Sequence, residues 1–357
     1  MQTDAVPIII PCFEPDERFV KLVEDLCAKV SPSSIVVVDD GSGPAHATAF
    51  DEVAARGVYV IRHAVNLGKG RALKDAFNHV LLAFPDAPGC VTADSDGQHT
   101  PTDILRVADA LCSGPDKLVL GVRVFDKQTV PAKSRIGNLV TRRLFSLFCG
   151  VNVSDTQTGL RGVPNELMAA CLSLPGERFE FEMEMLAHCR NRFGIVEVPI
   201  ETVYDSVDDH STHFDPLRDS VRIGKVLLRT FVGYSLSSLM SSVVDLGAFA
   251  LLSEAFKVAG IPFWAGLAVI VARVFSATFN FLVNWKGVFK AEGDGGRFAV
   301  RYFALAIVQM LVSAFLVDAL VQALPLPAIV TKAIVDVLLF FVSYQIQSRF
   351  VFKADDK

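Results

Sequence analysis

Before about residue 230, short apolar runs alternate with longer amphipathic segments. The apolar runs fall at 6–10, 35–38, 58–61, 90–93 and 118–121. Segments with helical spacing separate them, at about 16–29, 45–55, 69–83 and 101–112. Continuous apolar strands that alternate with helices are typical of a mostly parallel sheet covered on both faces. The pattern therefore predicts a Rossmann-like α/β domain over residues 1–215.

After that point the pattern changes to four long apolar spans, at about 231–255, 261–283, 298–320 and 328–345. Each approaches the ~20 residues that cross a bilayer, which predicts an all-α domain of four transmembrane helices over residues 231–357. The segment 216–230 between the domains carries four cations at helical spacing, Arg218, Arg222, Lys225 and Arg229. Next to an apolar span, this stripe favours a juxtamembrane interfacial helix that binds anionic lipid headgroups over a merely solvated face.

The composition also indicates a membrane protein with a cytosolic domain. The chain is 51% hydrophobic, and its net charge of −5 gives no case for a nucleic-acid partner. The seven cysteines are odd in number and show no metal-type pairing, so we expect reduced thiols in a reducing compartment. The N-terminus carries no positively charged region, and we expect no signal peptide.

The loop charges predict the orientation of the spans in the membrane. Cations lie between spans two and three (Lys286, Lys290, Arg297 and Arg301) and after span four (Arg349, Lys353 and Lys357). The other two loops offer little beyond Lys257 and Lys332. We therefore expect the N-terminal domain, the middle loop and the C-terminus to lie in the cytoplasm, in a multi-pass protein of the cell membrane.

The membrane half also contains an internal repeat and charges within its spans. Residues 281–289 and 344–352 share aromatic, amide, cation and Val-Phe positions in register, which predicts two related helical hairpins. Charges inside a span indicate function by default. We expect Lys332 and Asp336 to pair, and we favour an Arg273–Asp245 ion pair over a role for Arg273 in guiding a headgroup.

The strongest candidate for chemistry is the stretch Asp94-Ser95-Asp96-Gly97-Gln98. Residues i and i+2 of an extended strand point the same way, so both carboxylates can face one point beyond the run at 90–93. Mg²⁺ is often held by one or two carboxylates together with substrate phosphates. Taken alone, the motif is more often a polar loop. Because Pro11 and Asp39/Asp40 follow two other runs, and ligands bind beyond such strand ends, we favour a metal site.

A second candidate is the loop Asn66-Leu67-Gly68-Lys69-Gly70-Arg71, which opens a predicted helix. Glycines let the backbone approach a ligand, and helix N-termini bind phosphate groups. The spacing fits neither a P-loop nor a dinucleotide fingerprint. The amphipathic segment 133–147 is read either as a surface helix or as a helix on the membrane, and the polar loop 155–161 has no clear role by itself.

These motifs, in this order, resemble the family 2 glycosyltransferases, in particular the branch with dolichyl-phosphate mannosyltransferase and bacterial polyprenyl-phosphate glycosyltransferases. The matching stretches are Ile8-Ile9-Ile10-Pro11, Val37-Val38-Asp39-Asp40-Gly41-Ser42, 66–70, 94–98, Ser134-Arg135-Ile136-Gly137-Asn138 and Gln157-Thr158-Gly159-Leu160-Arg161. The second half resembles the GtrA-like membrane domain. Together the resemblances cover nearly the whole chain.

The resemblance implies a GT-A fold and inverting sugar transfer from a UDP- or GDP-sugar to a polyprenyl phosphate, with Mg²⁺ or Mn²⁺. The product would be a lipid-linked monosaccharide for cell-envelope glycan synthesis, and homo-oligomerisation stays open. It places the metal on Asp94, Asp96 and Gln98, and the acceptor phosphate on Arg123 and Arg135. The donor would be surrounded by Pro11, Phe13, Asp39, Asp40, Gly68, Lys69, Asp94 and Ser95.

Two positions depart from the family pattern. Where the family often reads Pro-x-Tyr-Asn-Glu, this chain has Pro15 in place of the acidic residue, so Glu14 or Asp16 would replace it. The basic residues often found after the last strand are altered to His210-Ser211-Thr212-His213-Phe214.

Two other functions compete with the transferase. A processive polysaccharide synthase would carry a Gln-x-x-Arg-Trp motif, which this sequence lacks. A flippase or scaffold whose domain only binds nucleotide-sugar would not need the full set of Asp94, Asp96 and Gln98.

Overall fold

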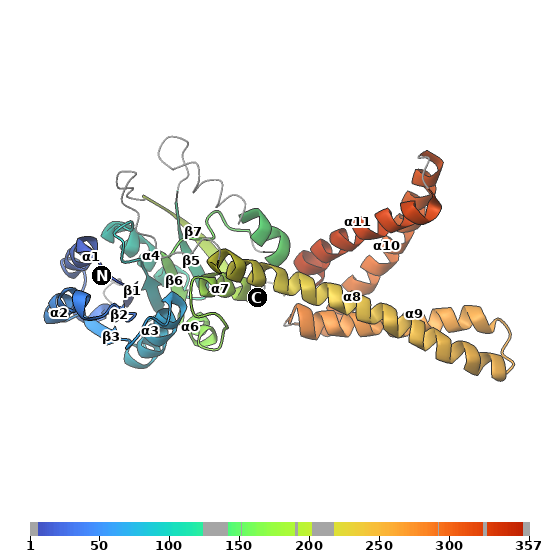
Figure 1. Ribbon diagram of the computed structural model, residues 1–357, viewed down its shortest axis with the longest axis horizontal. Helices are drawn as coiled ribbons and strands as arrows, with labels where there is room; N and C mark the ends of the chain where they lie inside the picture. The colour runs from blue at the N-terminus through green and yellow to red at the C-terminus, as the bar shows by residue number, and fades with distance from the viewer. Residues whose placement is uncertain are drawn as a thin grey trace. The chain divides into compact units, whose positions relative to one another are not determined.

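The computed structural model describes residues 6–123, 142–150, 152–189, 192–201, 218–291, 293–323 and 327–352. The chain divides into two compact units. The first holds residues 1–146 and 151–226, and the second holds residues 147–150 and 227–357. Each unit has its own hydrophobic core, and Figure 1 labels the helices and strands of both.

A seven-stranded sheet forms the centre of the first unit, in the order β3-β2-β1-β4-β6-β5-β7. The strands are β1 Ile8–Cys12, β2 Ile35–Asp39, β3 Tyr59–Arg62, β4 Gly89–Thr92, β5 Lys117–Arg123, β6 Arg161–Pro164 and β7 Gly194–Ile200. All pairs are parallel except those that β6 makes with β4 and β5. Because β2, β1 and β4 are adjacent and parallel, their carboxyl ends open at one edge of the sheet.

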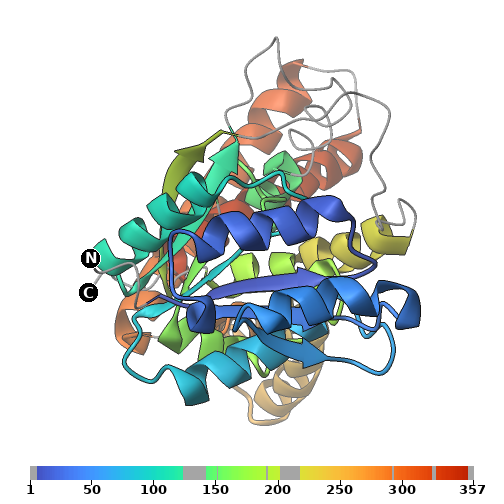
Figure 2. The same ribbon diagram turned by 90° about the vertical axis from the view of Figure 1, so that its left-hand side faces the viewer.

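Helices cover both faces of this sheet (Figure 2). They are α1 Glu17–Cys27, α2 Ala47–Ala55, α3 Lys69–Ala83, α4 Pro101–Ser113, α6 Asn165–Cys171 and α7 Glu180–Cys189. Apolar residues of α1, α2 and α4 pack with Ile8 and Ile10 in one core cluster. Helix α3 contacts β1 and β2 and also packs against α6 and α7. Local sequence sets where these helices begin: Thr100 caps α4 by accepting from the Asp103 N–H at 3.1 Å, with Pro101 in the first turn.

The prediction of a mostly parallel α/β sheet is confirmed, and the five predicted strands and four predicted helices are present within a few residues of the expected bounds. Strands β6 and β7 and helices α6 and α7 had no predicted counterpart. Strand β6 is four residues long and contains Gly162 and Pro164, which both weaken a strand pattern. All seven cysteines are free, as expected. Burial raises the pKa of the Cys12 thiol to about 12, so this thiol is unreactive.

The second unit consists of long apolar helices. They are α8 Arg218–Val258, which belongs to this unit from Leu227 onward, α9 Trp264–Leu282, α10 Gly295–Ala323 and α11 Ala328–Ile346. Within the described residues, four helices are long and apolar enough to cross a membrane, which confirms the four predicted spans. Helix α8 runs without interruption from the basic stripe into the first span (Figure 1). The two predicted segments 216–230 and 231–255 thus lie largely on one continuous helix.

The internal repeat is visible in the backbone of the second unit. Helices α9 and α11 both continue into a π-helical turn, at Val283–Val288 (η4) and Gln347–Val351 (η5). The two turns meet: the Asn284 side-chain amide donates to Gln347 Oε1 at 3.2 Å, and the rings of Phe289 and Phe352 stack at 5.0 Å between centroids. Matched positions of the repeat therefore contact one another, as expected for two related hairpins.

The charges within the spans form the expected pairs. Arg273 Nη2 lies 3.3 Å from Asp245 Oδ2, and Ser276 donates to Asp245 Oδ1 at 2.8 Å. Lys332 pairs with Asp336 one turn away on α11. These contacts confirm the ion-pair interpretation of both sets.

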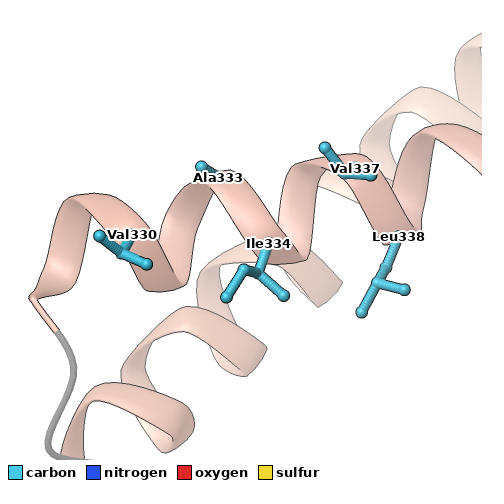
Figure 3. Close-up of a pocket in the computed structure, with 5 residues that line it drawn as sticks. All are labelled: Val330, Ala333, Ile334, Val337 and Leu338. Atoms are coloured by element: carbon cyan, nitrogen blue, oxygen red, sulfur yellow. The ribbon is translucent and has the colours of Figure 1, made fainter.

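Helix α11 also borders an apolar recess (Figure 3). It is lined by Val330, Ala333, Ile334, Val337 and Leu338. This lining exposes no polar atom. The recess therefore offers no group that could bind or activate a charged reactant.

Candidate active site

The candidate site is built at the carboxyl ends of β1, β2 and β4. Asp39 ends β2, and Asp94 follows β4 by two residues. Thr92, the last residue of β4, donates its hydroxyl to the Gly159 carbonyl at 2.8 Å. This bond holds the loop before β6 against the end of β4. The sheet therefore brings together the strand ends that the sequence predicted to share one crevice.

Asp94 forms the centre of a partly buried charge cluster. Its Oδ1 lies 2.6 Å from Lys69 Nζ, and its Oδ2 lies 3.5 Å from His99 Nε2. Lys69 Nζ also donates to Glu182 Oε2 at 3.1 Å. Burial acts to raise the pKa of Asp94, but the charges and hydrogen bonds of Lys69 and His99 outweigh it and hold that pKa well below its usual range. Asp94 is therefore an anion throughout the physiological pH range.

Asp96 is in the opposite electrostatic situation. Burial, and then the like charge of Asp94, raise the pKa of this carboxyl. Its Oδ1 accepts one backbone hydrogen bond, from Gln98 N at 3.1 Å. Two adjacent carboxylates that repel each other are stabilised by a cation placed between them.

The chemistry of this donor set fits a hard divalent cation shared with a ligand. Asp94, Asp96 and the Gln98 amide offer oxygen atoms, which Mg²⁺ and Mn²⁺ prefer. Within the described residues, no group of three or more His, Cys, Asp or Glu side chains converges as a complete metal site. The remaining ligands would have to come from water and a substrate phosphate, as is usual for Mg²⁺.

Gly159 shapes the surroundings of Asp94. A Cβ added at this position would lie 2.3 and 2.4 Å from the two carboxylate oxygens of Asp94. Real Cβ contacts are essentially never so short, so a larger residue would displace the carboxylate or the loop. The role of this loop was not predicted from the sequence, because residues 92–94 and 159 meet only in the folded sheet.

Asp40 is buried and holds the loop of residues 66–71, called the glycine loop below. Its Oδ1 accepts from Leu67 N at 2.9 Å and its Oδ2 from Gly68 N at 2.8 Å, and His63 Nδ1 lies 2.8 Å from Oδ1. Gly68 has a φ of +107°, a conformation that L side chains rarely adopt. The carboxylate of Asp40 thus fixes the turn that begins α3 and places Lys69. Its contact with the nucleotide stays a prediction.

The glycines of this loop make room for protein backbone. A Cβ at Gly68 would lie 2.4 Å from the Glu177 carbonyl oxygen, and one at Gly70 would lie 2.6 Å from the Phe181 Cβ. Buried Lys74 on α3 donates to the carbonyls of Leu174 and Gly176 at 2.7 and 2.8 Å. The start of α3 and the segment before α7 are therefore packed tightly. The predicted approach of these glycines to a ligand stays a prediction.

The residues at and just after the end of β1 differ in burial and in their contacts. Pro11 is buried within β1, and Phe13 follows the strand. Glu14 has a φ of +51° and donates its backbone N–H to the Ser42 hydroxyl at 2.9 Å. Asp16 caps α1 by accepting from Arg18 N at 2.9 Å and also pairs with the Arg18 side chain. Asp16 therefore has a structural task, and Glu14 is the better candidate for the family's acidic position.

Three further predicted positions have described neighbours. Asp39 Oδ1 accepts from Ser42 N at 2.9 Å, and the Ser95 hydroxyl interacts with the Cys12 thiol. Arg123, at the end of β5, contacts the fully buried Asp155 carboxylate through Nε at 2.6 Å and Nη2 at 3.0 Å. This bidentate pair orients Arg123, whose predicted contact with an acceptor phosphate is untested. Arg135 and the stretch 210–214 lie outside the described residues.

Comparisons with known proteins place the chain in a family. Residues 8–167 match the model "Glycosyl transferase family 2", and residues 228–352 match "GtrA/DPMS, transmembrane domain". An uncharacterized protein of Methanocaldococcus jannaschii is 31% identical over 207 residues, which are 56% of this chain and 82% of that protein. The chain belongs to glycosyl transferase family 2, joined to a GtrA/DPMS transmembrane domain, and is therefore a glycosyltransferase and a membrane protein.

Two further proteins are similar to parts of this chain. The UDP-N-acetylglucosamine–dolichyl-phosphate N-acetylglucosaminyltransferase of Methanococcus voltae is 29% identical over 223 residues, which are 57% of this chain and 88% of that protein. A solved structure of glucosyl-3-phosphoglycerate synthase from Mycobacterium tuberculosis has a TM-score of 0.44 at 17% identity, covering 62% of this chain and 78% of that one. Family membership and the observed sheet confirm the predicted GT-A class of α/β fold.

Proposed function

We propose that this protein transfers one sugar from a UDP- or GDP-sugar to a polyprenyl phosphate at the cytoplasmic face of the cell membrane, with inversion. The product would be a lipid-linked monosaccharide for cell-envelope glycans. The observation that carries the proposal is the pair Asp94 and Asp96 at a parallel strand end beside Lys69, in a chain that also holds four apolar helices. The name of the Methanococcus voltae relative, which acts on dolichyl phosphate, supports the acceptor class.

The acceptor chemistry needs no general base from the protein. A phosphate monoester has a second pKa near 6 and is largely a dianion at neutral pH, so its oxygen can attack the sugar directly. The protein must instead hold two anionic reactants close together. Lys69 supplies positive charge beside Asp94, and Arg123 and Arg135 would hold the acceptor phosphate by bidentate hydrogen bonds.

A divalent cation, Mg²⁺ or Mn²⁺, held by Asp94, Asp96 and Gln98 would act as a Lewis acid toward the leaving nucleoside diphosphate. The protein's own part is to orient these ligands. Gly159 leaves space for the Asp94 carboxylate, and the Gln98 backbone N–H fixes that of Asp96. Direct attack from the face opposite the leaving group produces inversion at the anomeric carbon.

The proposal is tested by identifying the product. Purified full-length protein is incubated with undecaprenyl phosphate and a panel of UDP- and GDP-sugars, with Mn²⁺ or with EDTA, and the lipids are analysed by mass spectrometry. We expect one donor to add a single sugar mass in a metal-dependent reaction. Asp96→Ala should abolish the product, whereas Asp109→Asn, an exposed carboxylate on α4, should not. Absence of product with every donor, or full activity of Asp96→Ala, would contradict the proposal.

A further inference from the structure

Lys69 is shared by two carboxylates that come from different elements. It is the first residue of α3, Asp94 follows β4, and Glu182 lies in the first turn of α7. Lys69 Nζ lies 2.6 Å from Asp94 Oδ1 and 3.1 Å from Glu182 Oε2, and its side chain is 17% exposed. Glu182 is buried and belongs to none of the predicted site residues. The ammonium group therefore bridges the candidate metal site and a carboxylate outside it.

Contacts of Arg161 and Lys74 hold the backbone of Glu182 and of the segment before α7. Arg161 is 1% exposed, and its Nη1 donates to the Glu182 carbonyl at 2.8 Å. Its Nη2 lies 3.9 Å from Glu182 Oε1 and has no hydrogen-bond partner within the described part of the chain. Lys74 fixes the segment before α7 against α3. The carboxylate of Glu182 is thus placed beside Lys69 by the fold and does not depend on a bound ligand.

The charges around Lys69 indicate why its ammonium group contacts both Asp94 and Glu182. Asp94 and Glu182 each present a carboxylate to Lys69, and Arg161 Nη2 lies 3.9 Å from the far oxygen of Glu182. Lys69 Nζ contacts Oδ1 of Asp94 at 2.6 Å and so competes with a metal ion for this oxygen. A cation that binds Oδ1 would displace the ammonium, and Glu182 offers that ammonium a second partner without a large movement.

We propose that Lys69 neutralises Asp94 until the metal binds, and that Glu182 is a positioning residue that keeps the displaced ammonium beside the donor diphosphate. This inference rests on the metal-dependent function proposed above. It assigns Glu182 an effect on metal affinity that passes through Lys69. Two other roles of Glu182 would give different results in a mutant cycle. In one, Glu182 is a direct metal ligand, and in the other, its negative charge attracts the metal ion without help from Lys69.

A double-mutant cycle on metal binding separates these roles. Mn²⁺ alone is titrated into the full-length protein, and free Mn²⁺ is measured by electron paramagnetic resonance. We expect Glu182→Gln to weaken Mn²⁺ binding about tenfold, because Lys69 then stays on Asp94. Lys69→Met should tighten binding severalfold, because the competing cation is gone. In the Lys69→Met background, Glu182→Gln should change the Kd less than about threefold.

Glu166→Gln removes an exposed carboxylate from α6 and should leave the Kd unchanged. Circular dichroism and thermal unfolding establish that each variant is folded, and Glu182→Asp should restore part of the affinity if the carboxylate itself matters. The inference is overturned if Glu182→Gln weakens binding equally with and without Lys69, if it has no effect, or if wild type binds no Mn²⁺. If the wild-type protein transfers sugar but the double-mutant cycle gives a contradicting result, the role of Glu182 is overturned and the proposed function stands.

Discussion

The two units of this protein bury polar groups in opposite ways. In the α/β unit, the cluster of Asp94, Asp96, Lys69 and Glu182 consists of ionisable side chains, of which Glu182 is buried and the other three are partly exposed. In the helical unit, the buried polar centre consists of neutral amides and hydroxyls, including Asn280, Asn284, Tyr302 and Gln347, whereas the cations of its ion pairs, Arg273 and Lys332, are exposed. Asn284 is fully buried there.

The difference follows from what each environment can tolerate. A charge placed in lipid is expensive, whereas hydrogen bonds between neutral side chains join membrane helices at modest gain. Tyr302 on α10 donates to Asn280 on α9 at 2.7 Å, and Asn284 reaches the turn after α11 through Gln347. The neutral network therefore joins the two hairpins. The charged cluster is suited to binding an anionic ligand with its cation, and its repulsions indicate a site arranged for that ligand.

The largest effect is expected where a charge is removed from the α/β cluster. Asp94→Asn removes the carboxylate that Lys69 contacts, and we expect sugar transfer to fall at least about a hundredfold. The reason is that even outer-shell changes cost about 10–100-fold in metal sites. The rate of lipid-product formation at saturating donor measures the change. A variant of near wild-type rate that folds normally would show that the charge is dispensable.

Gly159→Ala tests the space around the same carboxylate without changing any charge. The new Cβ would lie within 2.4 Å of both Asp94 oxygens, so we expect overpacking of about 1–3 kcal/mol and at least tenfold slower transfer. Gly114→Ala is the control, since its Cβ would meet Lys117 Cδ at an ordinary 3.6 Å. Thermal unfolding and initial rates of both variants are compared. Equal behaviour of the two variants would contradict the close contact.

Asn284→Leu tests the neutral network of the helical unit, and it should lower stability while it leaves the rate of sugar transfer almost unchanged. It removes the contacts to Asn280 and Gln347, so we expect a loss of about 0.6–1.7 kcal/mol of stability in detergent. The transfer rate per folded molecule should change less than about threefold. Thr278→Val is the matched control, because exposed Thr278 donates to the Val274 carbonyl of its own helix. A loss of transfer without a loss of stability would give the membrane network a catalytic part.

The smallest effect is expected at the surface cap of α1. Burial opposes ionisation of Asp16, but its hydrogen bonds and ion pair with Arg18 together outweigh burial and lower the pKa below the usual 3.8. A lowered pKa in the folded state gives stability that is present above pH 3.8 and is lost as the pH falls through the folded value. We expect Asp16→Ala to reduce the protection of α1 amides by about 0.5–1 kcal/mol at pH 7.

Hydrogen exchange of the 17–27 segment, corrected for intrinsic rates, measures this cap. The difference between Asp16→Ala and wild type should shrink toward pH 3. A difference that grows with acidity would mean that the carboxylate does not act as an ionised cap.

The local pattern predicted those parts of the structure that short stretches of sequence determine. The runs that became β1, β2 and β4 are fully buried, so their apolar character was continuous. The positions of Asp94, Asp96 and Lys69 followed from strand ends and a helix start. Strand β7 is only half-buried along most of its length, and its pattern was too weak to predict.

The contacts that complete the site could not be predicted because they join distant segments. Lys69 and Glu182 are 113 residues apart in the sequence, and Glu182 sits on a helix of mixed polarity with no strand-end signal. Likewise, the family resemblance implied that Asp40 contacts the nucleotide, which stays a prediction, and it did not indicate the contacts of Asp40 within the protein. The structure shows its carboxylate accepting from the backbone of residues 67 and 68, which depends on how β2 and the glycine loop pack.

The most direct test of sugar transfer to a lipid phosphate is ³¹P nuclear magnetic resonance of the complete reaction. The full-length protein, the active nucleotide-sugar, Mn²⁺ and a polyprenyl phosphate are followed together in detergent. We predict one equivalent of nucleoside diphosphate for each glycosyl phosphodiester, with the anomeric configuration opposite to that of the donor. Release of nucleoside diphosphate without a lipid phosphodiester, a product with several sugars, or a retained configuration would contradict the account.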